Sequence, residues 1–321
     1  RDRAAFSLAY GAGVQVFDEF PGSLDNGGER IALVQPVAGG ELLITDVRYD
    51  NRLPWPTNAA GFGPSLQLVD AARGSWRVAN WATTATNAAN RVTPGAPSSV
   101  AQSLAAFPSL WINEVLPNNV AGPQDNAGDR DPYIEIINTG TTAVSLSGLM
   151  LTDTFTNLPA WTFPVGTAIP AGGLLTVWAD GETGESAPGI PHTSFRLNPS
   201  SGAVALVRRQ GTANAPAVLD YLTWEQLPAG RSFGSIPDGE PRTRRILFNP
   251  TPGATNDPAA PVVNVVINEV MAQNTRTVAD PADGDWDDWI ELHNPTDSAI
   301  DLSGWSISDD ASLPQKNPFP M

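Results

Sequence analysis

Short apolar runs separated by Gly, Pro, Asn and Asp recur along most of the chain. No segment sustains the 3.6-residue period of a long amphipathic helix, and we expect no helix longer than two turns. Many short strands punctuated by turn residues are typical of a β-sandwich. In the central part, the pattern predicts strands near 110–116, 132–138, 144–152, 160–163, 173–179, 203–208, 217–223, 231–236 and 243–247.

The first hundred residues carry fewer and looser strand patterns. Residues 13–17 alternate, residues 30–34 and 42–49 have strand length with β-branched side chains, and residues 65–69 give a last alternation. Prolines on both sides of Trp55 exclude a central strand there. We therefore expect Trp55 to cap a core from a loop.

Parts of the central stretch are repeated elsewhere in the chain. Ile112-Asn113-Glu114-Val115 returns as Ile267-Asn268-Glu269-Val270, and Thr251-Pro252-Gly253-Ala254 has already occurred as Thr93-Pro94-Gly95-Ala96. Repetition at this scale indicates tandem modules. The sequence predicts the back part of a module at 1–97, a linker at 98–109, a complete module at 110–256, a Pro/Ala linker at 257–264 and the front part of another module at 265–321. For 98–109, one or two helical turns are the alternative.

The order of these motifs resembles the lamin-tail domain. The residues that carry the resemblance are Ile112–Val115, Ile134-Glu135 with Asn138, Leu146-Ser147-Gly148, Asp153, Phe163-Pro164 and Ile169-Pro170-Ala171-Gly172-Gly173. The resemblance implies an all-β chain of tandem immunoglobulin-like sandwiches, one complete and two partial. It also implies a bacterial, secreted or cell-surface location, and neighbouring domains in longer proteins that can carry a separate catalytic unit.

Composition narrows the function classes. The chain has 321 residues, 41% of them hydrophobic, with ten Trp and no Cys, and its formal net charge is −16. It has enough apolar residues for a folded core and no disulfide or thiolate site. The negative charge disfavours nucleic acid, and the absence of an apolar run near eighteen residues argues against membrane insertion.

The best candidate metal site is acidic. Asp283, Asp285 and Asp287 alternate around Gly284, so a curled loop can aim three oxygens at one Ca²⁺. The spacing is not that of an EF-hand. The alternative is a solvated turn whose carboxylates cap backbone N–H groups. Calcium is the one cofactor that the sequence suggests.

Other chemistry-bearing residues favour structural roles. Glu114 with Glu135, repeated as Glu269 with Glu291, is a carboxylate pair of the kind used in acid–base catalysis, but its recurrence with the module favours a hydrogen bond to a neighbouring loop. The two histidines, His192 and His293, fall in different modules. We expect His293 to face solvent, and neither to be a metal ligand.

Two surface features suggest binding. Trp55, Trp76 and Trp81 lie outside regular strand patterns, and as exposed aromatic rings they would stack on a glycan. The basic run 242–245 is the one positive patch, and it either guards an edge strand or meets an acidic surface.

The two partial modules add up to almost one module. Three explanations remain open: an excerpt of a longer tandem array, completion of one chain by the next in a head-to-tail filament, and closure within one chain. The sequence thus predicts a non-enzymatic extracellular structural or interaction protein that serves as spacer, adhesion segment or self-associating filament subunit. The alternatives are a glycan-binding surface module and part of a larger secreted protein with a separate catalytic domain.

Overall fold

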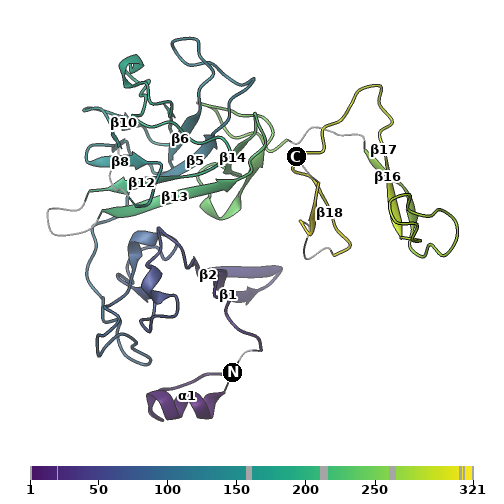
Figure 1. Cartoon of the computed structure of the whole chain (residues 1–321). Coiled ribbons are helices and arrows are strands. Elements are labelled where there is room, and N and C mark those ends of the chain that lie inside the picture. The colour runs from purple at the N-terminus through teal and green to yellow at the C-terminus, as the bar shows by residue number, and fades with distance from the viewer. Residues whose placement is uncertain are drawn as a thin grey trace.

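A computed structural model describes residues 2–19, 21–156, 161–209, 216–259, 265–310, 313 and 315–319. Figure 1 shows that strands are the main regular elements of the chain, and that the strands of its middle part, coloured teal to green, form a sandwich. In the described part of the chain, α1 (Arg3–Tyr10) is the single α-helix, and no helix there is long and apolar enough to span a bilayer.

The central module consists of two packed antiparallel sheets, as the strand spacing predicted. One sheet has the order β11-β6-β5-β14-β15 and the other the order β13-β12-β8-β9. The strands of the first sheet are β5 (Leu110–Leu116), β6 (Tyr133–Asn138), β11 (Leu174–Trp178), β14 (Ser232–Ser235) and β15 (Arg244–Leu247). Those of the second are β8 (Leu149–Thr152), β9 (Trp161–Thr162), β12 (Ser201–Arg208) and β13 (Ala217–Glu225). A short ribbon pairs β7 (Val144–Ser145) with β10 (Ala168–Ile169).

The core of this module lies between the two sheets. Ile112 and Ile134 from the first sheet meet Leu151, Leu206 and Leu222 from the second, and all five are buried. Gly202 on β12 leaves space for the ring of Trp224 on the paired strand β13, since an added Cβ would lie 2.4 Å from that ring. Each stretch predicted as a strand in this module contains one, but 144–152 is divided into β7 and β8, which lie in different sheets, and β10 was not predicted.

The N-terminal segment forms small separate ribbons. β1 (Arg30–Val37) pairs with β2 (Gly40–Arg48), and β3 (Gln67–Leu68) pairs with β4 (Trp81–Ala82). The prediction of a strand at 13–17 is wrong, because no neighbouring strand pairs with these residues in the described structure. The helix α1 was not predicted; the Asp2 carboxylate caps its first turn by accepting the Ala5 N–H at 2.9 Å.

The loop around Trp55 covers the outer face of the four-stranded sheet. Trp55 is 1% exposed and packs with Met150, Val207 and Val218. Its indole N–H donates to the Tyr221 hydroxyl at 3.0 Å. Trp55 therefore caps a core from a loop, as predicted, and that core belongs to the central module.

The stretch 98–109 contains neither a helix nor a strand, and β5 begins directly after it. It is held at several points. Ser99 N–H donates to Gln67, Leu104 N–H donates to Asp70, and Arg208 donates to the Ala106 carbonyl. These bonds connect the N-terminal segment to β12 across the predicted linker.

The C-terminal copy carries two hairpins. β16 (Val266–Met271) pairs with β17 (Trp289–His293), and β18 (Ser306–Ile307) pairs with β19 (Asn317–Pro318). In Figure 1 these strands, at the yellow end of the colour bar, stand away from the two large sheets. The side chains of β16 and β17 are accordingly exposed or only half-buried.

Candidate functional site

The two glutamates of the central module hold a loop in place. Glu114, fully buried on β5, accepts from the Tyr133 hydroxyl at 2.7 Å, from the Ser232 hydroxyl and from the Thr251 N–H. Glu135, fully buried on the neighbouring β6, accepts the Gly253 N–H at 2.5 Å. The carboxylates thus fasten the 251–254 turn across the end of the sheet.

Asn113 and Asn256 extend this network. Asn113 donates to Glu135 at 2.9 Å and to Asp238 at 3.2 Å, and its side-chain oxygen accepts the Gly239 N–H. Asn256 donates to the carbonyls of Asn113 and Ser235. Because buried polar groups are costly when unpaired, this network fixes the register of β5, β14 and the last loop.

Burial controls the ionisation of both glutamates. It raises the pKa of Glu135 to about 7, although the hydrogen bonds from Asn113 and Gly253 oppose the shift. Burial likewise raises the pKa of Glu114, against the hydrogen bonds from Ser232 and Tyr133. A raised pKa is common in catalytic carboxyls, but here each carboxyl is enclosed and already bonded to its own backbone loop.

A buried arginine joins the N-terminal segment to the central module. Arg77 is 5% exposed and donates to the carbonyls of Pro108, Leu110 and Leu219 at 2.9–3.0 Å. Its guanidinium lies 3.5 Å from the centroid of the Trp111 ring, a cation–π contact. Burial lowers its pKa to about 10, so it remains charged at neutral pH.

A second ionic contact lies nearby. Asp46 on β2 is 3% exposed and is paired with Arg30 at 2.8 Å and with Arg242 of the central module at 3.0 Å. Burial raises the pKa of Asp46, but the hydrogen bonds from Arg242 and Arg30 outweigh it, and the pKa lies below its ordinary value. Arg242 of the basic run thus meets an acidic residue, while Arg244 and Arg245 lie on the edge strand β15, so the run has features of both roles predicted for it.

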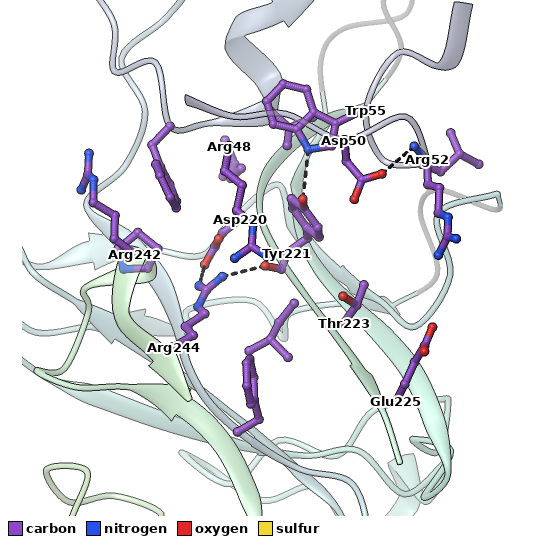
Figure 2. Close-up of a pocket in the computed structure, with 17 residues that line it drawn as sticks. Arg48, Asp50, Arg52, Trp55, Asp220, Tyr221, Thr223, Glu225, Arg242 and Arg244 are labelled. Carbon is purple, nitrogen blue, oxygen red and sulfur yellow. Dashed lines mark hydrogen bonds and ion pairs between the residues drawn. The ribbon is translucent and has the colours of Figure 1, made fainter. Parts of the chain in front are cut away.

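A cavity of about 280 Å³ lies at this junction, between the loop around Trp55 and β13. Figure 2 shows Arg244 pointing toward Asp220 and the Tyr221 carbonyl, with Trp55 above them. Charged side chains of both signs line the cavity, and two of them, Asp220 and Arg244, form an ion pair. The cavity belongs to the contact between the two parts of the chain.

The tryptophans proposed for glycan stacking do not form an exposed row. The prediction for Trp55 is wrong, because this ring is buried against the four-stranded sheet. Trp81 is half-buried and donates to the Ser75 carbonyl. Trp76 is half-buried, and the guanidiniums of Arg30 and Arg242 lie over its ring at 5.9 and 4.8 Å from its centroid.

The C-terminal acidic loop brings together a partly different trio. One ligand atom from each of Asp280, Asp283 and Asp287 lies within 4.8 Å of the others, and Asp285 is outside this group. Asp283 and Asp287 are exposed. Asp283 accepts the Asp285 N–H, as expected for a turn in which a carboxylate caps the backbone.

The matching loop of the central module is more enclosed. Asp125 belongs to two groups with mutual distances within 4.8 Å, one with Asp131 and Asp180 and one with Glu185 and His192. His192 is fully buried, and its ring nitrogens lie 2.6 Å from Asp180 and 2.8 Å from Asn126. The other histidine, His293, faces solvent as predicted.

Two features were missed from the sequence. Asn119 and Asn274 are buried and make the same contacts in the two copies, each donating to two backbone carbonyls of its own acidic loop. Their equal spacing, five residues after Glu114 and Glu269, is a signal that identifies them. No pattern in the sequence distinguishes Arg77 from the exposed arginines.

The comparisons agree with the architecture. The sequence profile described as Lamin Tail Domain matches residues 104–225 and 258–317, which make up more than half of the chain. No curated protein matches it. The profile covers β5 through β13 and, a second time, β16 through β19, so it detects the same repeat as the motifs and the paired strands. The chain therefore belongs to the lamin-tail domain family, with an immunoglobulin-like fold.

Proposed function

We propose that this chain is a non-enzymatic structural protein of the cell surface or extracellular space, in which lamin-tail modules serve as a rigid spacer. The observation that carries the proposal is the buried contact made by Arg77. A charged side chain that donates to two carbonyls of the central module and to one of the stretch that leads into it fixes one orientation of the two parts.

Other contacts at the same junction support rigidity. Trp55 buries its ring on the outer sheet face and donates to Tyr221, while Asp46 bridges to Arg242. Apolar burial, a neutral hydrogen bond and an ion pair thus act at separate points of one surface. The carboxylates Glu114 and Glu135, which a glycosidase would need at an open cleft, are instead enclosed and bonded to a loop.

Distance measurements between two spin labels test the rigid spacer. The chain has no Cys, so the substitutions Glu41→Cys on β2 and Thr162→Cys on β9 create a unique labelling pair at exposed positions. We expect one narrow distance distribution, and a broad one after Arg77→Met. Arg52→Met, at an exposed position of the same segment, is the matched control and should leave the distribution narrow. A broad distribution in the unsubstituted labelled chain would contradict rigidity.

A second candidate role is self-association. Asn268 donates to Glu291 as Asn113 does to Glu135, but Glu269 and Glu291 are exposed. In the central module the same positions are covered by the 251–254 turn. Residues 93–96 have the same sequence and the same closing hydrogen bond, here from Ala96 N–H to Thr93 carbonyl. The turn of one copy is therefore a chemically matched cover for β16 and β17 of another.

Light scattering and negative-stain imaging over a range of concentrations test this association. We expect mass to rise with concentration, and Ile267→Asp on the exposed face of β16 to abolish the rise. Val165→Asp, at a fully exposed position of the central module, should not. A monodisperse monomer at every concentration would exclude the association. Retention on cellulose or chitin would instead support the glycan-binding alternative.

A further inference from the structure

Three carboxylate oxygens in and beside the acidic loop of the central module are buried without any hydrogen-bond partner. They are Asp125 Oδ2, Asp131 Oδ2 and Glu185 Oε2. A buried carboxylate oxygen that accepts no hydrogen bond is strongly disfavoured, and three in one place need a compensating positive charge. In the described residues around them, Arg196 pairs with Asp131, and it does so through the other oxygen, Oδ1, at 2.7 Å.

The local backbone fixes the direction of these side chains. Asp125 Oδ1 accepts the N–H groups of Ala127, Gly128 and Asp129 at 2.8–2.9 Å, so the loop curls around this one oxygen. The remaining oxygen of the same carboxylate is the unpartnered one. Asp131 is itself only 3% exposed and comes just before β6, so both ends of the loop are anchored.

The second half of the cluster comes from the segment after β11. Asp180 is 5% exposed, and its Oδ1 accepts the Glu182 N–H at 2.9 Å while Oδ2 lies against His192. Glu185 ends a short 3₁₀ turn (Thr183–Glu185), and its carbonyl accepts from Asn126.

The distances suit one hard cation. Two oxygens bound to the same Ca²⁺ at about 2.4 Å can be separated by at most about 4.8 Å. Ligand atoms of Asp125, Asp131 and Asp180 lie within 4.8 Å of one another, and a second group with the same spacing joins Asp125 to Glu185 and His192, so Asp125 is common to both. Both ring nitrogens of His192 are occupied by Asp180 and Asn126, so the free donors are carboxylate oxygens, which favour Ca²⁺ over a transition metal.

We propose that the central module binds one Ca²⁺ at Asp125, with Asp131, Asp180 and Glu185 as the other carboxylate ligands. His192 acts as a positioning residue that orients Asp180. The ion joins the 124–131 loop to the segment after β11, two stretches that flank the β6–β11 edge of the sheet. This site is distinct from the exposed Asp283 loop, and it does not depend on the proposed spacer role.

Terbium luminescence and Ca²⁺ calorimetry on the full chain test the proposal. Tb³⁺ substitutes for Ca²⁺, and Trp178, whose ring stacks on His192 at 6.5 Å between centroids, provides a sensitising indole. We expect sensitised emission that Ca²⁺ displaces and equal Mg²⁺ does not, and one Ca²⁺ per chain lost in Asp125→Asn. Because affinity depends on the number of charged ligands, Asp131→Asn and Glu185→Gln should each weaken binding by about tenfold or more.

The matched control is Asp283→Asn in the exposed loop, which should leave the Trp-sensitised signal and the calorimetric site unchanged. Circular dichroism of each variant verifies folding, and the partly exposed Glu185 provides a variant least able to disturb the core. The proposal is overturned if the unsubstituted chain binds no Ca²⁺ at millimolar concentration, or if Asp283→Asn abolishes binding while folded Asp125→Asn and Glu185→Gln retain it.

Discussion

The hairpins β5–β6 and β16–β17 have nearly the same sequence and very different surroundings. Both pair antiparallel, and both have a register shift just before the glutamate, between Ile112 and Glu114 in one and between Ile267 and Glu269 in the other. Yet Ile112 is 0% exposed and Ile267 is 60% exposed. Local sequence therefore sets the pairing and the bulge, while the burial of Ile112 depends on strands that arrive from elsewhere, here β8, β12 and β13 of the facing sheet.

The largest difference between the hairpins should appear on truncating the matched isoleucines. Ile112→Ala removes a side chain from the sandwich core and should lower the free energy of unfolding by about 2–5 kcal/mol. Ile267→Ala, at the exposed position, should change it by less than about 0.5 kcal/mol. Urea denaturation of each variant, followed by circular dichroism, gives both values.

These denaturation measurements are made at a protein concentration at which the chain is monomeric. If Ile267→Ala costs as much as Ile112→Ala under that condition, the β16–β17 face is buried within one chain and the comparison fails. If it costs stability only at high concentration, the face is buried between chains, as self-association requires.

The next effect is a pH dependence confined to the central hairpin. Glu135 has a pKa of about 7 in the folded state, raised by burial, against an ordinary value of 4.5. The folded state therefore binds more protons than the unfolded state between these values. The stability that Glu135 contributes is fully present below about pH 4.5. It is lost as the pH rises through about 7, by about 3 kcal/mol in total.

Glu135→Gln isolates this contribution, because glutamine keeps the size and the acceptor oxygen for Gly253 but does not ionise. The difference in unfolding free energy between the unsubstituted chain and this variant should fall by about 3 kcal/mol from pH 4.5 to pH 8. Glu291→Gln, at the exposed matching position, is the control. A difference that is constant with pH would show that folding does not shift the pKa of Glu135.

Much of the fold could be predicted from the sequence, because its signals are local. Alternation and turn residues identified all the longer strands of the central module but missed the two-residue β10, and the repeated Ile-Asn-Glu-Val predicted the second hairpin. The structural role of Glu114 and Glu135 followed from their recurrence. In residues 13–17 the same kind of alternation gave no strand, because a strand also needs a partner.

The candidate sites were harder to predict, because they depend on contacts between distant residues. The acidic spacing favoured Asp283, Asp285 and Asp287, whereas the enclosed cluster needs Asp180 and Glu185, more than fifty residues after Asp125. The loop context of Trp55 fits both an exposed ring and a cap on a core, and its contacts with β8, β12 and β13 show that it is a cap.

The smallest of the three effects concerns the matched asparagines. Asn113→Ala removes the donor to Glu135 and Asp238 and the acceptor for the Gly239 N–H, all in a buried network, and should cost about 2 kcal/mol. Asn268→Ala removes the equivalent bond to Glu291, but water reaches both partners there, and the cost should stay below about 0.5 kcal/mol.

Denaturation of the two asparagine variants gives a sharper comparison than the isoleucine pair, since it tests the polar network without creating a large apolar cavity. If Asn113→Ala lowers the free energy of unfolding as little as Asn268→Ala does, water reaches the network and the network does not hold the 251–254 turn in place. If only Asn113→Ala lowers the free energy of unfolding, the same Asn–Glu hydrogen bond stabilises the fold only where a turn covers it. That condition is the one that residues 93–96 of a second copy would supply to β16 and β17.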